Sequence, residues 1–332
     1  VDQRLVPLVR RPHDIDGARL QISCSVGVAI YPDDAQDLDT LMRHADVAMY
    51  QAKALGRDMA HFFTPELNAL AQQRMKLEAN LRSAVEREEL SLHYQPKVDA
   101  RSGRVLGVEA LLRWRNAELG EIAPVQFIPI AEETRLIVAI GAWVIDEACR
   151  QMAEWRARQL DIPQVSVNVS ALQLEDDSLI GSLRAALERH ALPPGAVELE
   201  LTESMLMDRA EQTLARLHAI KRLGVELAID DFGTGYSSLN YLNRFPIDRL
   251  KIDRSFVRDM FEDPTDLAIT RAIIGLGHTL GLKVVAEGVE TEREAQTLRG
   301  AGCDELQGYL FSRALPPEML VDWLQRRIWR RA

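Results

Sequence analysis

The sequence predicts an α/β protein whose main part is a (β/α)8 TIM-like barrel. From Leu90 onward, short apolar runs typical of strands alternate with longer stretches of helical periodicity. Many of the apolar runs end in a carboxylate or amide side chain, which is expected where a site lies at the carboxyl ends of parallel strands. A chain of 332 residues is also long enough for one barrel and an appendage.

The first 63 residues follow a pattern of their own. Leu20 to Ile30 alternates into a strand, and Leu38 to Leu55 has the apolar spacing of a helix that Gly56 ends. Thr64 and Pro65 are a typical cap and first residue of a second helix. This polar helix is predicted to run to about Glu89 and to connect the two parts of the chain.

The rest of the chain contains eight predicted strands separated by helices. The strands are Leu92–Gln95, Val105–Arg113, Val165–Val169, Val197–Leu201, Glu226–Asp230, Arg249–Ile252, Lys283–Glu287 and Leu306–Phe311. The predicted helices are Pro124–Val138, Ala142–Gln159, Leu179–His190, Met205–Leu223, Pro264–Leu280, Glu292–Ala301 and Pro316–Arg327. A doubly wound open sheet is the alternative, but it would gather its site at one topological switch point, whereas here nearly every strand ends in a polar residue.

Five of the strand-end side chains offer only oxygen as a metal ligand: Glu109, Asn168, Glu200, Asp230 and Asp231. Oxygen ligands favour hard divalent cations, namely Mg²⁺, Mn²⁺ or Ca²⁺, over zinc. Each acid alone is equally well read as a solvated loop residue or a helix cap. Their placement at successive strand ends instead predicts a centre for two cations, an arrangement that suits phosphodiester hydrolysis.

Three further strand-end residues carry charges that suit this chemistry. Lys251 is predicted either to form a buried salt bridge or to orient an attacking water. Glu287, followed by Gly288, is a candidate proton acceptor. Arg113 has the planar fork that matches phosphate, although an Arg–Glu pair elsewhere in the barrel is the alternative.

The segment Asp231–Ser238 contains two glycines and follows a strand directly. It is either an ordinary turn with a serine cap or a loop that positions the second cation and couples it to a neighbouring subunit. Gln95 and Gln307 end strands at the two seams of the barrel, where they either contact a base or ribose or form part of the wall.

Composition sets outer limits on the function. The apolar fraction of 47% and the charged fraction of 27% are those of an ordinary soluble protein. The net charge of -10 argues against nucleic acid as a bulk partner, and no apolar run is long enough to span a membrane. The widely spaced Cys24, Cys149 and Cys303 predict reduced core residues in a cytoplasmic protein. Because the chain begins at Val1, we expect a fragment whose parent could be anchored to the inner membrane by a missing N-terminal part.

Several motifs together resemble the EAL family of cyclic di-GMP phosphodiesterases over about residues 73–330. These motifs are Gln95-Pro96-Lys97, Glu109-Ala110-Leu111 with Leu112-Arg113, Phe127–Glu132, Asn168-Val169-Ser170, Glu200–Glu203, Asp230–Gly235, Lys251-Ile252-Asp253, Glu287–Glu290 and Gln307-Gly308-Tyr309. The resemblance implies a modified barrel in which the first strand runs against the others. It also implies that Glu109, Asn168, Glu200, Asp230 and Asp231 bind metal.

The resemblance implies roles for the other site residues as well. Glu287 would be the general base, with Lys251 as its helper at the water. Glu203 would hold the Asp231–Ser238 loop, and the substrate site would be lined by Gln95, Arg113, Gln307 and Asp253. We find no departure from the family pattern at these positions.

The first 63 residues resemble the C-terminal part of a GGDEF diguanylate cyclase domain. The matching segments are Ser25–Ala29, Ala45–Tyr50, Ala52-Lys53 and Gly56-Arg57. The chain contains no Gly-Gly dipeptide, so cyclase activity is not expected of it. The expected organisation is a partial GGDEF segment over 1–63, a connecting helix over 64–89 and the EAL barrel over 73–330.

The sequence therefore predicts an enzyme of bacterial second-messenger signalling, of the kind linked to biofilm control, that hydrolyses cyclic di-GMP to linear pGpG with two Mg²⁺ or Mn²⁺ ions. Ca²⁺ is expected to support turnover poorly or to inhibit it. The alternatives are a receptor that binds cyclic di-GMP without turnover and a domain that regulates a neighbouring cyclase. The resemblance also implies a homodimer through the barrel. A group of apolar and aromatic side chains beside the Asp231–Ser238 loop supports a dimer, unless these side chains cap their own barrel helix. The group consists of Tyr236, Leu239, Tyr241, Leu242 and Phe245.

Overall fold

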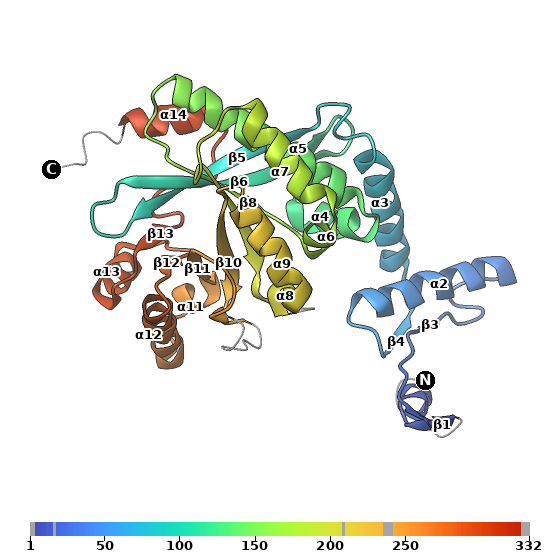
Figure 1. Cartoon of the computed structure of the whole chain (residues 1–332). Helices are drawn as coiled ribbons and strands as arrows, with labels where there is room; N and C mark the ends of the chain where they lie inside the picture. Colours follow the sequence, from blue (N-terminus) through green and yellow to red (C-terminus); the bar gives the residue numbers. More distant parts are fainter. Residues whose placement is uncertain (1–3, 16–17, 208–209, 235–241, 327–332) are drawn as a thin grey trace. The chain divides into compact units, whose positions relative to one another are not determined.

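The structure, a computed structural model, describes residues 4–15, 18–207, 210–234 and 242–326. The chain divides into two compact units, one over Val1–Asn80 and one over Leu81–Ala332. Figure 1 shows the course of the chain through both units. Among the described residues, no helix combines the length and the apolar character needed to cross a membrane.

The first unit is small. It contains the elements α1 (Leu5–Val9), β1 (His13–Ile15), β2 (Ala18–Leu20), β3 (Val26–Val28), α2 (Leu38–Ala54), β4 (Ala60–Phe62) and α3 (Pro65–Leu81). Strands β3 and β4 pair in parallel, and β1 and β2 form an antiparallel ribbon. Ala48, Phe63 and Leu67 form its buried cluster. The predicted strand over Leu20 to Ile30 is thus two short strands that belong to different sheets.

The second unit contains a closed barrel of eight strands. They are β5 (Leu90–Asp99), β6 (Val105–Asn116), β8 (Val165–Asn168), β9 (Val197–Thr202), β10 (Glu226–Phe232), β11 (Arg249–Ile252), β12 (Lys283–Ala286) and β13 (Glu305–Gln307). Strand β5 is antiparallel to both of its neighbours, β6 and β13, whereas the other barrel ladders are parallel. The predicted barrel with a reversed first strand is therefore confirmed. A short extra strand, β7 (Gly120–Ile122), pairs with the end of β6.

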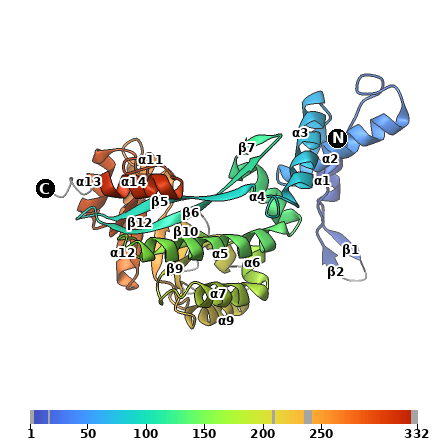
Figure 2. The same ribbon diagram turned by 90° about the horizontal axis from the view of Figure 1, so that it is seen from above.

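Helices surround this barrel (Figure 1), and Figure 2 shows α5 and α7 packed along each other on one side. The described helices are α4 (Pro124–Glu133), α5 (Leu136–Ala157), α6 (Ala171–Glu175), α7 (Ser178–Arg189), α8 (Glu203–Met207), α9 (Ala210–Lys221), α11 (Arg254–Arg258), α12 (Pro264–Thr279), α13 (Glu292–Ala301) and α14 (Pro317–Arg326). The three cysteines are free; Cys149 and Cys303 are buried and Cys24 is partly exposed.

Two helix boundaries differ from the prediction for physical reasons. The break between α4 and α5 falls at Arg135, which has a left-handed φ of 60°, instead of between Val138 and Ala142, so Gly141 lies inside α5. A Cβ at Gly141 would come within 1.7 Å of Nε2 of Gln173, so this glycine serves close packing. Helix α3 ends at Leu81 instead of about Glu89, because the next residues form separate turns and Glu88 has a left-handed φ of 56°.

Candidate active site

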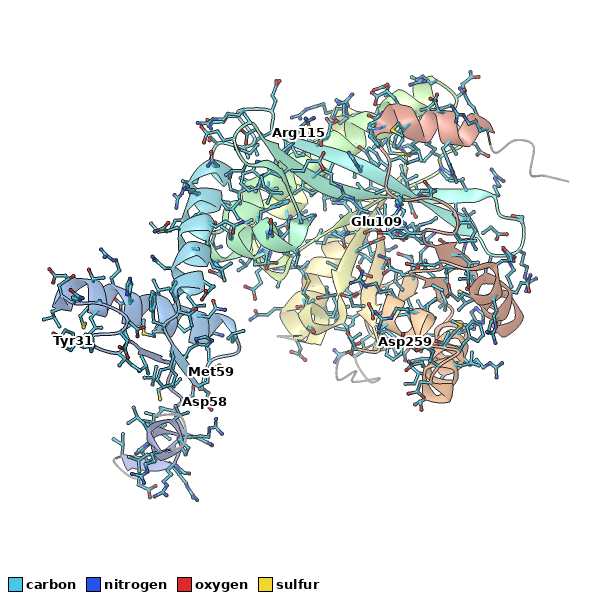
Figure 3. All side chains as sticks on the ribbon, turned by 180° about the vertical axis from the view of Figure 1, so that it is seen from behind. Tyr31, Asp58, Met59, Glu109, Arg115 and Asp259 are labelled. Carbon is cyan, nitrogen blue, oxygen red and sulfur yellow. The ribbon has the colours of Figure 1, made fainter. Side chains whose placement is uncertain are left out.

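The candidate site lies at the carboxyl ends of the parallel barrel strands. The ladder register aligns its side chains there: Gln95 is paired with Glu109, and Asn168 with Glu200. Glu287 directly follows β12, and its N–H donates to the carbonyl of Ile252 at 3.2 Å. Figure 3 shows Glu109 well inside the barrel unit, while Arg115 lies farther along the same strand, where β6 continues past the barrel.

The buried ammonium group of Lys251 is the centre of the site. Its Nζ lies 2.6 Å from Oε1 of Glu287 and 3.1 Å from Oδ1 of Asp230, and it also contacts Oε2 of Glu200. Burial disfavours the charge of Lys251, but the surrounding carboxylates, Glu109 first among them, outweigh burial and raise its pKa well above the usual value. Lys251 is therefore a fixed positive charge among acids.

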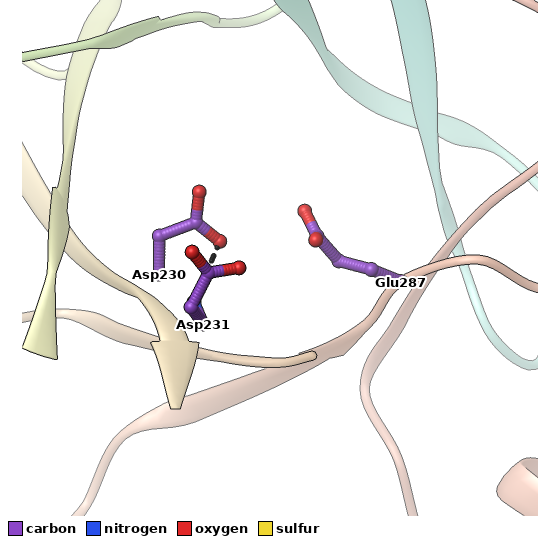
Figure 4. Close-up of side chains that lie close together, drawn as sticks. All are labelled: Asp230, Asp231 and Glu287. Carbon is purple, nitrogen blue, oxygen red and sulfur yellow. Dashed lines mark hydrogen bonds between the residues drawn. The ribbon is translucent and has the colours of Figure 1, made fainter. Parts of the chain in front are cut away.

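Asp230 and Asp231 are consecutive, yet both carboxylates belong to one cluster with Glu287. Consecutive residues of a regular strand point to opposite faces. Here the pairing of β10 with β11 is irregular between Ile229 and Phe232, and Asp231 has a left-handed φ of 53°. The irregular backbone brings oxygens of all three residues within 4.8 Å of one another, and Figure 4 shows the three carboxylates converging. The N–H of Asp231 also donates to Oδ1 of Asp230 at 3.0 Å.

This convergence leaves negative charge crowded together. The pKa of Asp231 is raised to about 6, mainly by burial and also by the neighbouring charges of Asp230 and Asp253. Burial also raises the pKa of Glu287 well above its usual value, against the opposing effect of Lys251. A bound cation would oppose both shifts, because it would stabilise the charged form of each carboxylate.

Glu109 is held by two amide side chains. Its Oε1 accepts from Nδ2 of Asn168 at 2.6 Å, and its Oε2 accepts from Nε2 of Gln307 at 2.6 Å. Gln307 also donates to Oε1 of Gln95 at 3.3 Å, while Gln95 donates to the carbonyl of Ser312 at 3.1 Å. The two predicted seam glutamines thus contact each other, and Gln307 contacts a predicted metal ligand.

Glu203, at the start of α8, is connected to the segment that follows the Asp pair. Its side chain is buried, and Oε2 accepts from the backbone N–H of Gly233 at 3.0 Å. Residues 235–238 of the predicted loop lie outside the described residues. The described start of the loop, from Asp231 to Thr234, is therefore tied to β9 and α8 through one buried carboxylate.

Asp253 and Arg113 occupy different environments near the site. Asp253 caps α11 by accepting from the N–H of Ser255 at 3.0 Å, and it also shares a hydrogen bond with Asp231. Arg113 is half-buried and donates to the carbonyl of Leu112 at 2.9 Å. Burial lowers the pKa of Arg113, and Tyr309 and Glu109 oppose this effect. Asp253 thus stabilises the loop region, whereas Arg113 has further donors available for an anionic ligand.

The donor set fits hard divalent cations. Glu109, Asn168, Glu200, Asp230 and Asp231 supply only oxygen for coordination, and carboxylate oxygens have several lone-pair sites, so their present hydrogen bonds leave room for a cation. A second feature is the raised pKa of Asp231, which burial and then the charges of Asp230 and Asp253 produce and which a cation would oppose. The fit is therefore supported both by the ligand atoms and by the electrostatics of the cluster.

One buried residue that contacts the site was not singled out from the sequence. Nζ of Lys97 lies 3.4 Å from Oε1 of Glu200 and 2.5 Å from Oε1 of Glu198, and it also contacts Oγ of Ser166. The signal in the sequence was the spacing of Glu198 and Glu200, which places two acids on the same face of β9. Acids inside a closed barrel require positive partners, and Lys97 is one of the partners of Glu198 and Glu200.

Comparison with known proteins matches both parts of the chain to families. The EAL domain model matches residues 78–314, and the model of the diguanylate cyclase GGDEF domain matches residues 2–59. The predicted resemblance to both families is thereby confirmed.

Two relatives illustrate the similarity. The chain is 49% identical over 319 residues to the bifunctional diguanylate cyclase/cyclic di-GMP phosphodiesterase MucR of Pseudomonas aeruginosa, covering 96% of this chain and 47% of the relative. It is 41% identical over 327 residues to the cyclic di-GMP phosphodiesterase PdeR of Escherichia coli, covering 98% of this chain and 49% of the relative. The chain thus spans about half the length of these relatives.

A solved structure extends the similarity to the fold. The structure described as the PaMucR phosphodiesterase in complex with c-di-GMP is 51% identical, with a TM-score of 0.72, and the match covers 74% of this chain and 99% of that one.

Proposed function

This chain belongs to the EAL domain family, and we propose that its barrel hydrolyses cyclic di-GMP to linear pGpG. The observation that carries the proposal is the convergence of Asp230, Asp231 and Glu287 beside the buried ammonium group of Lys251. The names of two close relatives, each a cyclic di-GMP phosphodiesterase, support the choice of substrate.

We assign the binding of two divalent cations, Mg²⁺ or Mn²⁺, to the oxygen ligands at the rim: Glu109, Asn168, Glu200, Asp230 and Asp231. When bound, such cations supply Lewis acidity that makes water easier to deprotonate, and they offset the negative charge of the phosphodiester. In the protein alone, these acids would repel the substrate.

Glu287 is the residue that we assign to accept the proton from the attacking water. Its Oε1 is paired with Lys251 at 2.6 Å, so Oε2 is the oxygen that we expect to take the proton. Lys251 holds Glu287 in place and keeps a positive charge next to the reacting phosphate. Water attacks phosphorus and gives a proton to Glu287, the bond from phosphorus to the ribose 3′ oxygen breaks, and that oxygen takes up a proton from solvent as the linear dinucleotide forms.

We assign the positioning of the substrate to Arg113, Gln95, Gln307 and Asp253. The remaining donors of Arg113 suit a phosphate oxygen, since a guanidinium group binds phosphate through two parallel hydrogen bonds. The contact of Gln307 with Glu109 would couple substrate position to the cation site. Asp253 would act on the substrate from the end of β11, beside its hydrogen bond to Asp231.

Product analysis by chromatography tests this function. With Mg²⁺, we expect the purified chain to convert cyclic di-GMP to pGpG, and with excess EDTA we expect the dinucleotide to remain intact. Tight binding of cyclic di-GMP without any product in Mg²⁺ would instead indicate a receptor. A chain that neither binds nor cleaves the dinucleotide would point to a regulatory domain.

We further propose that the barrel forms a homodimer beside the Asp231–Ser238 loop. The proposal is supported by the family resemblance. The apolar group beside the loop supports a dimer interface less than expected. Leu242 and Phe245 are buried against their own chain, with exposed fractions of 2% and 5%. Tyr236, Leu239 and Tyr241 lie outside the described residues.

A further inference from the structure

Polar side chains form two tiers inside the barrel, at positions two residues apart on four strands. The upper tier belongs to the candidate active site and contains Gln95, Glu200, Lys251 and Gln307. The lower tier lies one step deeper and contains Lys97, Glu198, Arg249 and Glu305. Side chains two residues apart on a strand point to the same face, so each of the four strands contributes one residue to each tier.

The lower tier is a buried network of charges. The exposed fractions of Lys97, Glu198 and Glu305 are 1%, 0% and 1%. Arg249 lies 2.6 Å from Oε2 of Glu198 and 3.0 Å from Oε1 of Glu305, and it also contacts Glu226. The interiors of (β/α)8 barrels are usually filled by branched apolar side chains, and each buried ion costs several kcal/mol of desolvation. A contribution to folding stability therefore does not explain why this tier consists of charged side chains.

Lys97 is the residue of the lower tier whose side chain contacts a residue of the upper tier. It comes from the antiparallel strand β5, and its ammonium group is fixed from below by Oε1 of Glu198 at 2.5 Å and by Oγ of Ser166. The same ammonium group lies 3.4 Å from Oε1 of Glu200. By contrast, within the described residues neither Arg249 nor Glu305 forms an ion pair with Glu200.

Glu200 is consequently held between two ammonium groups. Oε1 faces Lys97, and Oε2 contacts Lys251. These two contacts restrict the rotation of the carboxylate group about its bond to the side chain, while free lone pairs remain on both oxygens for a cation. A buried carboxylate without the lower contact would be free to turn away from the rim or to shift toward Lys251.

We propose that Lys97 is a positioning residue, which fixes the Glu200 carboxylate from below and so presets one ligand of the metal centre. This inference rests on the proposed function, because it assigns a support to a cation ligand named there. Partners that orient metal ligands typically change metal affinity by 10–100-fold when they are removed. The contribution of Lys97 should therefore be measurable in metal binding, before any substrate is added.

The test compares two double variants that each remove one cation and one acid of the lower tier. Lys97→Met with Glu198→Gln removes the pair that supports Glu200, and the substituted residues carry no unpaired charge. Arg249→Met with Glu305→Gln is the matched control, because it removes a pair from the same tier that does not touch Glu200. The readout is Mn²⁺ affinity, measured on the whole chain without substrate by isothermal titration calorimetry and by the paramagnetic resonance signal of free Mn²⁺.

We expect the Lys97 double variant to bind Mn²⁺ at least about tenfold more weakly than the unmodified chain. The matched control should remain within about twofold of it. Equal Mn²⁺ affinity in the Lys97 double variant and the unmodified chain would overturn the proposal. So would a control that loses as much affinity, because the effect would then be a general consequence of disturbing the lower tier.

Circular dichroism in EDTA establishes that each variant is folded before its affinity is compared. If the Lys97 double variant does not fold, Lys97→Gln takes its place, since Glu198 then keeps Arg249 and Ser166 as partners. Measurements on the unmodified chain distinguish a failure of the proposed function from a failure of the role proposed for Lys97. If it binds no Mn²⁺ and makes no pGpG, the proposed function fails. If it does both while the Lys97 variants bind Mn²⁺ equally well, only the role of Lys97 is wrong.

Discussion

At the scale of single residues, the arrangement of the site depends on a few positive charges that face many negative ones. Lys251 contacts Glu200, Asp230 and Glu287, so one ammonium group determines the arrangement of three acids. The sequence located all four residues, because each stands at or just after the end of an apolar strand. It could not indicate which acid pairs with the lysine, since that depends on strand register and on side-chain rotamers.

Replacement of Glu287 by glutamine tests the assigned proton acceptor. We expect Glu287→Gln to keep affinity for cyclic di-GMP within a few-fold and to lower turnover by about a hundredfold or more, the scale of a lost general base. Single-turnover kinetics with a separate binding titration would measure both quantities. Glu188→Gln, at an exposed position of α7, is the matched control and should change neither. Near-normal turnover in Glu287→Gln would move the base to another residue.

Replacement of Glu109 by alanine should produce a different pattern. Glu109 is a proposed cation ligand and also accepts from Asn168 and Gln307. We therefore expect Glu109→Ala to weaken metal binding and substrate binding together, by calorimetry with Mn²⁺ and by a binding titration with cyclic di-GMP. An unchanged Mn²⁺ affinity would remove Glu109 from the ligand set.

The identity of the cation is a further test at this scale. We expect full activity in Mg²⁺ or Mn²⁺, whereas Ca²⁺ should support substrate binding with poor turnover. Oxygen ligands accept all three ions, but calcium takes more ligands at longer distances and so misplaces the water. Rates measured after dialysis against a chelator and re-addition of each ion would decide this. Undiminished activity in excess chelator would refute the metal centre.

At the scale of elements, strand ends and helix starts place the site residues. The irregular pairing of β10 brings both Asp230 and Asp231 to the carboxylate cluster with Glu287, a feature that strand periodicity alone does not predict. Helix α13 begins shortly after Glu287 with a capping box, in which Thr291 and Glu294 exchange hydrogen bonds with the backbone. The cap fixes the end of the segment that starts with the proposed base.

Thr291 offers a test of this cap. We expect Thr291→Ala to lower the free energy of unfolding by about 1 kcal/mol, because a backbone N–H of α13 loses its acceptor. Thr291→Ser retains the hydroxyl group and should cost clearly less. Urea unfolding followed by circular dichroism would compare the variants. Equal stabilities of the alanine and serine variants would mean that the hydroxyl group contributes nothing to the helix start.

The elements also show what sequence reasoning can and cannot recover. All eight barrel strands were predicted, because buried strands read as apolar runs of the right length. The break between the helices predicted over Pro124–Val138 and Ala142–Gln159 was misplaced, since it falls at Arg135 and Gly141 lies inside α5. Lys97 was not singled out as a site residue because its role depends on strands that are far apart in the chain.

At the scale of the whole molecule, the proposed assembly is the least constrained feature. The described residues supply two buried apolar side chains beside the loop, Leu242 and Phe245, and these are covered by their own chain. Glu203 anchors the described start of the loop within one subunit. Any contribution from a second subunit would therefore act on a segment that is already tied at one end.

A dilution series tests the coupling between assembly and turnover. If the dimer orders the loop and so fixes Asp231, we expect specific activity to fall as the dimer dissociates, with a smaller change in substrate affinity. Sedimentation velocity and specific activity should be followed over the same concentrations. Constant specific activity across a clear dimer-to-monomer transition would exclude the coupling, even if the dimer is real.

The closure of the barrel has a consequence for how the protein is made. Gln307, on the last strand, contacts Gln95 and Glu109, which precede it by 212 and 198 residues. Contacts between such distant positions form late, because a long loop must close first. During synthesis, all of the proposed acidic ligands are therefore present on the nascent chain before the last strand emerges from the ribosome. Until then β5 and β12 remain open edges, exposed to pairing with other chains. Catalytic competence and protection from aggregation should thus be gained in the same final step of folding.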